Sequence, residues 1–133
     1  MELLLVDASP SRAHHDAQQS GSSALQVEGA LLLSGGVTST VLEIGALGGS
    51  VEVRAPALPL TVSPTVRFQS VGLSILVRDC NAAIGWATGD RPFTIRWRDE
   101  YGKAHLDRAG DFGRSMARSL IRYTDDVCGP RNR

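Results

Sequence analysis

The sequence is poor in the residues that most often reveal a protein's chemistry. Aromatic residues make up 5 % of its 133 residues, cysteine occurs twice, and lysine occurs once beside 13 arginines. No run approaches the 18 or so apolar residues of a membrane-spanning helix. The short apolar run at residues 3–6 follows no basic segment, so we expect no signal peptide. These absences predict a cytoplasmic protein, and the bias from lysine to arginine indicates a GC-rich bacterial or phage genome.

The two cysteines, Cys80 and Cys128, belong to no recognisable motif. No Cys-x-x-Cys pair and no cluster of cysteine with histidine indicates zinc. In a cytosolic chain the default is a pair of reduced thiols. A disulfide is the less favoured alternative, and it would stabilise the fold by closing a long loop. We therefore predict free thiols, no metal site and no cofactor.

Catalytic and ligand-binding motifs are also missing. A nucleophilic pair of Cys80 or Cys128 with His105 has the right residue types, but no spacing brings them together. The adjacent His14 and His15 lie in a polar stretch without a third metal ligand at useful spacing. The glycine doublets open no helix and match no phosphate-binding pattern. We therefore predict that the protein is not an enzyme.

The last third of the chain has the clearest pattern, beginning with a β-hairpin over residues 93–106. Apolar and polar residues alternate along its first strand. Its tip ends in Gly102, which suits the left-handed position of a hairpin turn. The adjacent carboxylates Asp99 and Glu100 are expected to be exposed turn formers with ordinary pKa values.

A helix is predicted over residues 111–128. Apolar residues recur there every three or four positions, which is the spacing of one helix face. Large apolar side chains of the hairpin, Phe93, Ile95 and Trp97, share one face of their strand. Because aromatic side chains bury large areas, we expect this face to pack against the helix.

The chain before the hairpin alternates between short apolar segments and turns rich in glycine or proline. These segments predict strands. Residues 72–78 are apolar on both faces, as in a central strand, and residues 84–87 are predicted as a further short strand. Residues 1–23 are predicted as a flexible N-terminal segment or, alternatively, as an edge strand plus linker, because residues 8–23 are almost free of large apolar side chains.

Together these patterns predict an α+β fold. It would consist of a curved antiparallel β-sheet of about six to eight short strands with one C-terminal α-helix packed on a face. Residues 24–133 are expected to form a single β-rich domain.

Charge is unevenly distributed, although the net charge is zero. Residues 1–90 carry 4 basic and 8 acidic residues, whereas residues 91–133 carry 10 basic and 6 acidic residues. Such asymmetry indicates an anionic partner, or attraction between the two halves within one chain or between two copies. Three of the arginines repeat every four positions along the predicted helix, and two lie on the polar face of the hairpin.

These observations predict a small, non-enzymatic protein–protein interaction module that binds a protein partner or a second copy of itself, and no membrane. One alternative is a nucleic-acid-binding protein that uses the arginines of the helix or of the hairpin. A second alternative is a small ligand-binding or enzymatic domain. Tyrosine, tryptophan and arginine are typical interface anchors. The candidate interaction residues are Trp86, Arg96, Arg98, Tyr101, Arg114, Arg118 and Arg122.

Overall fold

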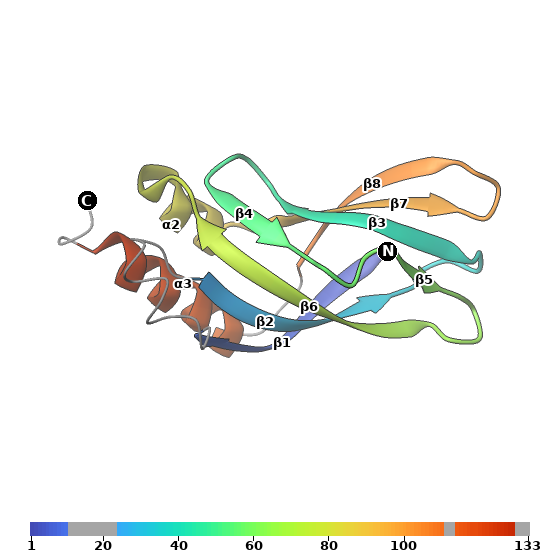
Figure 1. The fold of residues 1–133 in the computed structure, drawn as a ribbon, viewed down its shortest axis with the longest axis horizontal. Coiled ribbons are helices and arrows are strands. Elements are labelled where there is room, and N and C mark those ends of the chain that lie inside the picture. Colours follow the sequence, from blue (N-terminus) through green and yellow to red (C-terminus); the bar gives the residue numbers. More distant parts are fainter. Residues whose placement is uncertain (11–23, 111–113, 130–133) are drawn as a thin grey trace.

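The structure is a computed structural model that describes the backbone of residues 1–10, 24–110 and 114–129. This part of the chain contains eight strands and two helices (Figure 1). The strands are β1 (Glu2–Pro10), β2 (Ala24–Leu32), β3 (Ser39–Ala46), β4 (Val51–Arg54), β5 (Leu60–Val62), β6 (Phe68–Val77), β7 (Phe93–Asp99) and β8 (Ala104–Ala109). The helices are α2 (Cys80–Thr88), between β6 and β7, and α3 (Arg114–Cys128), after β8.

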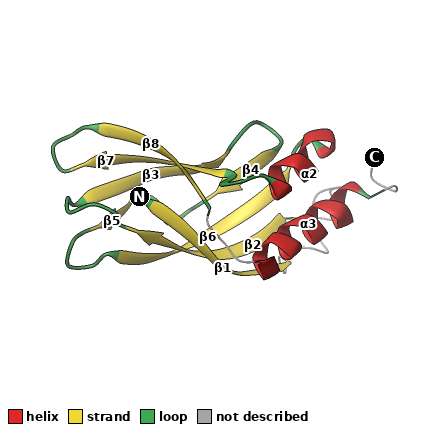
Figure 2. Cartoon of the chain, turned by 180° about the vertical axis from the view of Figure 1, so that it is seen from behind, coloured by secondary structure: helices red, strands yellow, loops and turns green. Residues whose placement is uncertain are grey.

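The strands form two four-stranded sheets that pack face to face (Figures 1 and 2). One sheet has the order β1-β2-β6-β4 and the other the order β5-β3-β7-β8. All paired neighbours are antiparallel. The predicted α+β class, the antiparallel pairing and the number of strands are therefore confirmed. The strands divide between two sheets because the chain passes from one sheet to the other at each connection from β2 to β6.

The hydrophobic core lies between the two sheets. Along β2 and β7, buried and exposed residues alternate, since successive side chains of a strand point to opposite faces. Each fully buried aliphatic or aromatic side chain contributes about 1.5–3 kcal/mol relative to an exposed one. The core residues from the two sheets include Leu3, Leu5, Leu25, Val27, Leu31, Val71, Leu73 and Ile75 on one side and Val41, Ile44, Val62, Phe93 and Ile95 on the other.

The N-terminal residues belong to this core. Met1, Leu3 and Leu5 are buried, and β1 pairs with β2 at the edge of its sheet. Over residues 2–10 the structure therefore has the edge strand that was the alternative prediction, and not the flexible segment. The burial of β1 is hard to predict from the sequence, because it depends on pairing with β2, which follows later in the chain. The predicted linker, up to residue 23, lies outside the described residues.

Residues 84–87 lie in helix α2, so the short strand predicted there is wrong. Asp79 caps the helix, because its Oδ1 accepts a hydrogen bond from the amide of Asn81 at 3.0 Å. A short apolar run does not by itself distinguish a strand from a buried stretch of helix.

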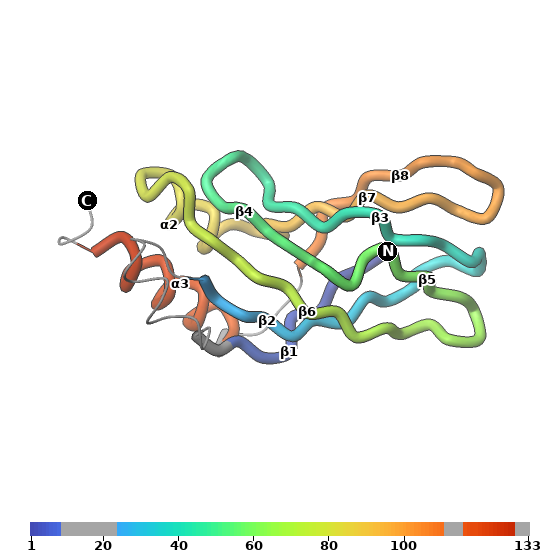
Figure 3. The backbone as a smooth tube through the Cα atoms, in the orientation of Figure 1, coloured from blue at the N-terminus to red at the C-terminus, as the bar shows by residue number. Residues whose placement is uncertain are grey.

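The predicted C-terminal helix is confirmed over Arg114–Cys128 and buries Met116, Leu120 and Tyr123. It lies against α2 and the edge strand β1 at one end of the molecule (Figure 3). The expected packing of this helix on the apolar face of the hairpin is wrong. Phe93 and Ile95 belong to the core between the two sheets instead, because the apolar face of the sheet β1-β2-β6-β4 covers them, and Phe93 also packs against Trp86 of α2.

A hydrogen-bonded tyrosine and a disulfide fasten α3 to the rest of the fold. The hydroxyl of Tyr123 donates to the carbonyl of Ile75 at 3.0 Å and accepts from the amide of Val77 at 3.4 Å. Burial raises the pKa of Tyr123 above its usual value. Cys80 and Cys128 form a disulfide with an S–S distance of 2.07 Å. The prediction of free thiols is therefore wrong.

Candidate functional site

The hairpin of β7 and β8 carries two exposed arginines on its outer surface. In β7, Phe93 and Ile95 point into the core, so Arg96 and Arg98 point outward. Across the strand pair, Arg96 lies opposite Leu106 and Arg98 lies opposite Ala104. The hairpin thus places arginine beside apolar side chains on one outward face.

The neighbouring strand β3 adds a third apolar side chain. The pairing of β3 with β7 shifts register between Val41 and Glu43, and such a bulge changes the direction of the side chain at the inserted residue. Leu42 is 40 % exposed there, and Leu106 on β8 is 66 % exposed. These strands surround a shallow hollow of about 430 Å³ lined by Leu42, Arg96, Arg98, Ala104, His105 and Leu106. We call Leu42, Arg96, Arg98, Ala104 and Leu106 the basic face.

In the part of the chain that the structure describes, the cations of this region are not neutralised by ion pairs. Within the described residues, no ion pair involves Arg96, Arg98 or Lys103. Glu43 lies opposite Arg96 in the strand register, and Glu100 lies in the hairpin turn. An exposed apolar surface with unpaired arginines is typical of a binding site for an anionic group.

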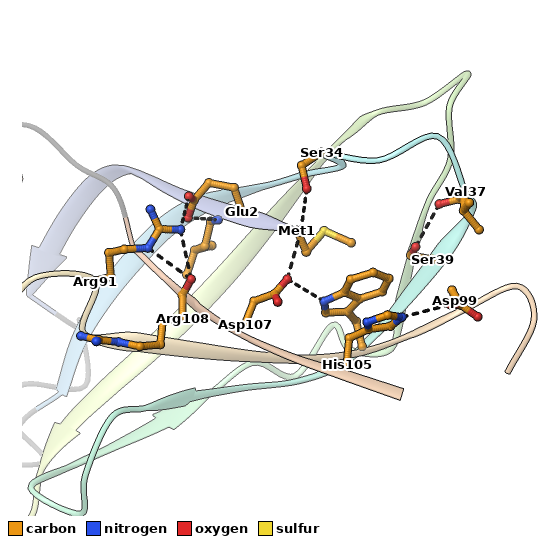
Figure 4. A network of polar contacts seen from close by, with 12 residues as sticks. Met1, Glu2, Ser34, Val37, Ser39, Arg91, Asp99, His105, Asp107 and Arg108 are labelled. Carbon is orange, nitrogen blue, oxygen red and sulfur yellow. Dashed lines mark hydrogen bonds and ion pairs between the residues drawn. The ribbon is translucent and has the colours of Figure 1, made fainter. Parts of the chain in front are cut away.

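On its inner side the hairpin is held by a network of polar contacts (Figure 4). The ring of Trp97 stacks on His105 with a centroid distance of 4.0 Å. The Nε1 of Trp97 donates to Oδ2 of Asp107 at 2.9 Å, and the same oxygen accepts from the Met1 ammonium at 3.2 Å. That ammonium also donates to the hydroxyl of Ser34 at 2.8 Å. These contacts fix the strand that presents the arginines on its other side.

Asp99 organises the hairpin tip. Its Oδ1 accepts hydrogen bonds from the amides of Tyr101 and Lys103 at 2.9 and 3.0 Å, and its Oδ2 lies 3.0 Å from Nε2 of His105. The hydrogen bond with His105 is the main reason that the pKa of Asp99 is lowered, so the prediction of an ordinary pKa is wrong for this residue. Gly102 has a φ of 84°, which confirms the predicted left-handed turn position.

The charge of Asp99 is expected to stabilise the fold in a pH-dependent way. Because its pKa in the folded state lies below the usual value of 3.8, this stabilisation is present above that pH and is lost as the pH falls through the folded-state pKa. The isosteric variant Asp99→Asn should therefore melt at a lower temperature than the wild type at pH 7. Thermal unfolding of both proteins from about pH 7 to pH 2 should show the two melting temperatures converging below about pH 4. A constant difference over this range would contradict the assignment.

The base of the hairpin is closed by contacts from two other segments. Arg91 donates from Nε and Nη2 to the carbonyl of Arg108 at 3.3 and 3.0 Å, and it forms an ion pair with Glu2 of β1. Oε1 of Glu2 accepts from the amide of Gly110 at 3.3 Å. The edge of β8 is thus covered at this end.

The remaining candidate interaction residues do not belong to the basic face itself. Trp86 is 7 % exposed, and its Nε1 donates to the carbonyl of Pro92 at 2.8 Å, so it is a core residue and not an exposed anchor. Tyr101, at the hairpin tip, is 82 % exposed. Arg118 and Arg122 are exposed on α3, which lies at the other end of the molecule from the hairpin tip (Figure 1).

The side chain of Arg114 lies outside the described residues. Leu42, Ala104 and Leu106 are site residues that sequence reasoning missed. For Ala104 and Leu106, the alternation of the return strand could have placed them on the same face as Arg96 and Arg98, but no sequence signal pairs Leu42 with this hairpin.

Comparison of the chain with protein families, with curated proteins and with solved structures gives no match. Among the described residues, no group of three or more histidine, cysteine, aspartate or glutamate side chains is placed to hold a metal ion. Neither of the two described helices has the length and apolar character needed to cross a membrane.

Proposed function

We propose that this protein is a non-enzymatic interaction module that binds a partner protein through the basic face. The observation that carries the proposal is the combination, on one sheet, of exposed Leu42 and Leu106 around a shallow hollow with Arg96 and Arg98, which form no ion pair among the described residues. Interface centres combine apolar contact area with arginine in this way. Tyr101 extends the surface at the hairpin tip.

Nucleic-acid binding is the weaker candidate. It would draw on the same unpaired cations, because neutralising phosphates with arginine and lysine supplies most of the affinity for nucleic acid. The exposed Arg118 and Arg122 do not extend the basic face, since they lie at the other end of the molecule (Figure 1). A single basic surface that follows a duplex is therefore not formed by these two groups of arginines.

The disulfide indicates the redox environment in which the protein acts. Disulfides persist mainly in oxidising compartments, and they are rare in the reducing cytoplasm. The Cys80–Cys128 bond therefore favours an oxidising environment over the cytoplasmic location that the composition predicts. Self-association and a bacterial or phage origin remain predictions from the sequence.

Charge reversal on the basic face tests the proposal. The wild type, the double variant Arg96→Glu with Arg98→Glu, and the control double variant Arg118→Glu with Arg122→Glu are immobilised at equal density and exposed to lysate of the native host. We expect quantitative mass spectrometry to find partners that the control retains and that the basic-face variant loses at least tenfold. Equal capture by all three proteins, or loss only with the control, would contradict the proposal.

A further inference from the structure

We propose that the basic face binds its partner by strand addition, with an extended acidic segment of the partner pairing along the open edge of β8. This inference rests on the proposed function and specifies how the partner is recognised. Strand addition combines main-chain hydrogen bonds at a sheet edge with side-chain contacts on the sheet face. The basic face and the β8 edge meet at Ala104 and Leu106.

The hydrogen-bond register of the hairpin identifies the backbone groups that face this edge. The amide of Asp99 donates to the carbonyl of Lys103 at 3.0 Å, and in antiparallel strands such bonded positions recur every second residue. His105 and Asp107 therefore direct their backbone groups toward β7. The even-numbered residues of β8 direct theirs outward, since β8 is the last strand of its sheet.

Two contacts confirm this assignment at the base of β8. The carbonyl of Arg108 faces outward and accepts from Arg91, and the amide of Gly110 faces outward and donates to Glu2. The backbone amides and carbonyls of Ala104 and Leu106 also face outward, and they have no hydrogen-bond partner within the described part of the chain. The open edge therefore comprises two amides and two carbonyls, at the end of the hairpin that carries the arginines.

The other three sheet edges are short or protected. At β1, the carboxylates of Glu2 and Asp7 accept hydrogen bonds from the amides that follow them, those of Leu3 and Ala8, at 3.0 and 2.9 Å. Strand β4 has four residues and strand β5 has three. Short strands and capped amides are common ways of preventing unwanted edge pairing. The part of β8 next to the hairpin tip, residues 104–106, lacks these protections. The charged residue at this end is Lys103, which immediately precedes the strand.

The charges select an acidic occupant. A strand added beyond β8 would lie two strand spacings, about 9.6 Å, from β7. Arg98 lies opposite Ala104, whose methyl group leaves room for a guanidinium to reach across β8 toward that strand. Lys103 lies at the same end of the edge. A carboxylate beside Ala104 would thus gain a charge-assisted hydrogen bond from Arg98.

A designed peptide tests the mode of binding directly. The probe is a terminally blocked nonapeptide of alternating valine and glutamate, which presents all its carboxylates on one face of a strand. Controls are the valine–glutamine peptide and the valine–glutamate peptide with N-methylated backbone amides. Binding is followed by fluorescence anisotropy, and amide hydrogen exchange is measured by NMR for Ala104 and Leu106. Variants Arg98→Gln and, as control, Arg118→Gln are compared with the wild type.

We expect the glutamate peptide to slow exchange at Ala104 and Leu106 at least tenfold, and N-methylation to abolish binding. Arg98→Gln should weaken binding of the glutamate peptide about tenfold, as loss of one charge-assisted hydrogen bond implies, while Arg118→Gln should leave the affinity for this peptide unchanged.

Binding without protection of these amides, equal binding of the N-methylated peptide, or no binding overturns strand addition. Protection that appears in the protein alone as its concentration rises assigns the edge to a second copy and also overturns it. In each case the capture experiment with the double variants decides separately whether the basic face binds a partner.

Discussion

Removing the Cys80–Cys128 disulfide is expected to lower the free energy of unfolding by about 4 kcal/mol. The two cysteines are 48 residues apart in the sequence, so the bond closes a long loop in the unfolded chain. A cross-link of this kind stabilises a protein mainly by restricting the unfolded state, and the effect grows slowly with loop length. Natural domains of this size have total stabilities of only about 5–15 kcal/mol, so the loss is large.

The measurement is urea unfolding of the wild type and of the variant that carries both Cys80→Ala and Cys128→Ala. Reduction of the wild type with excess dithiothreitol provides an independent route to the same state and should shift the unfolding midpoint in the same direction. The slope of the transition should also rise, because the unfolded chain becomes less compact without the cross-link. A variant as stable as the wild type, or two free thiols per native chain in a thiol titration, would show that the bond does not operate in solution.

The fold class could be predicted because it depends on local pattern. Alternation identifies the hairpin, a spacing of three and four residues identifies α3, and Gly102 marks the turn at the hairpin tip. Helix α2 was not predictable by the same reasoning, because the cap at Asp79 and the short apolar run after it are compatible with a turn followed by a strand. The partition of the strands into two sheets also escapes prediction, since it depends on pairing between distant segments.

The part of the candidate site that lies on the single hairpin of β7 and β8 could be predicted from the sequence. Arg96 and Arg98 share a face because strand residues two apart always do, and Tyr101 is exposed because it lies in the turn. Leu42 belongs to the basic face only through the pairing of β3 with β7 and the bulge in it. That pairing joins segments about 50 residues apart, for which a single sequence contains no signal.

The disulfide and the lowered pKa of Asp99 have the same origin. Cys80 and Cys128 meet because α2 packs against α3, and Asp99 meets His105 because the two strands of the hairpin pair in one register. Neither contact is visible in the residue types alone. The surface formed by the arginines and the apolar side chains beside them likewise arises only when the strands pair.

Replacing Trp86 with alanine is expected to lower the free energy of unfolding by about 3–5 kcal/mol, the usual cost of removing a large aromatic side chain from a core. The indole packs edge to face against Phe93 with a centroid distance of 5.3 Å. Its loss leaves a cavity and removes one of two hydrogen bonds that the carbonyl of Pro92 accepts, the other coming from the amide of Leu47 at 2.8 Å.

The matched control is Tyr101→Ala, which removes the other aromatic residue that the sequence suggested as an interface anchor. Because Tyr101 is 82 % exposed, its removal should change the free energy of unfolding by no more than about 0.5 kcal/mol. Urea unfolding of both variants gives the stabilities, and partner capture at a temperature where each variant is folded gives the binding. We expect Trp86→Ala to lose stability and keep binding, and Tyr101→Ala to keep stability and lose part of the binding. The opposite result would place Trp86 on the interaction surface and remove the hairpin tip from it.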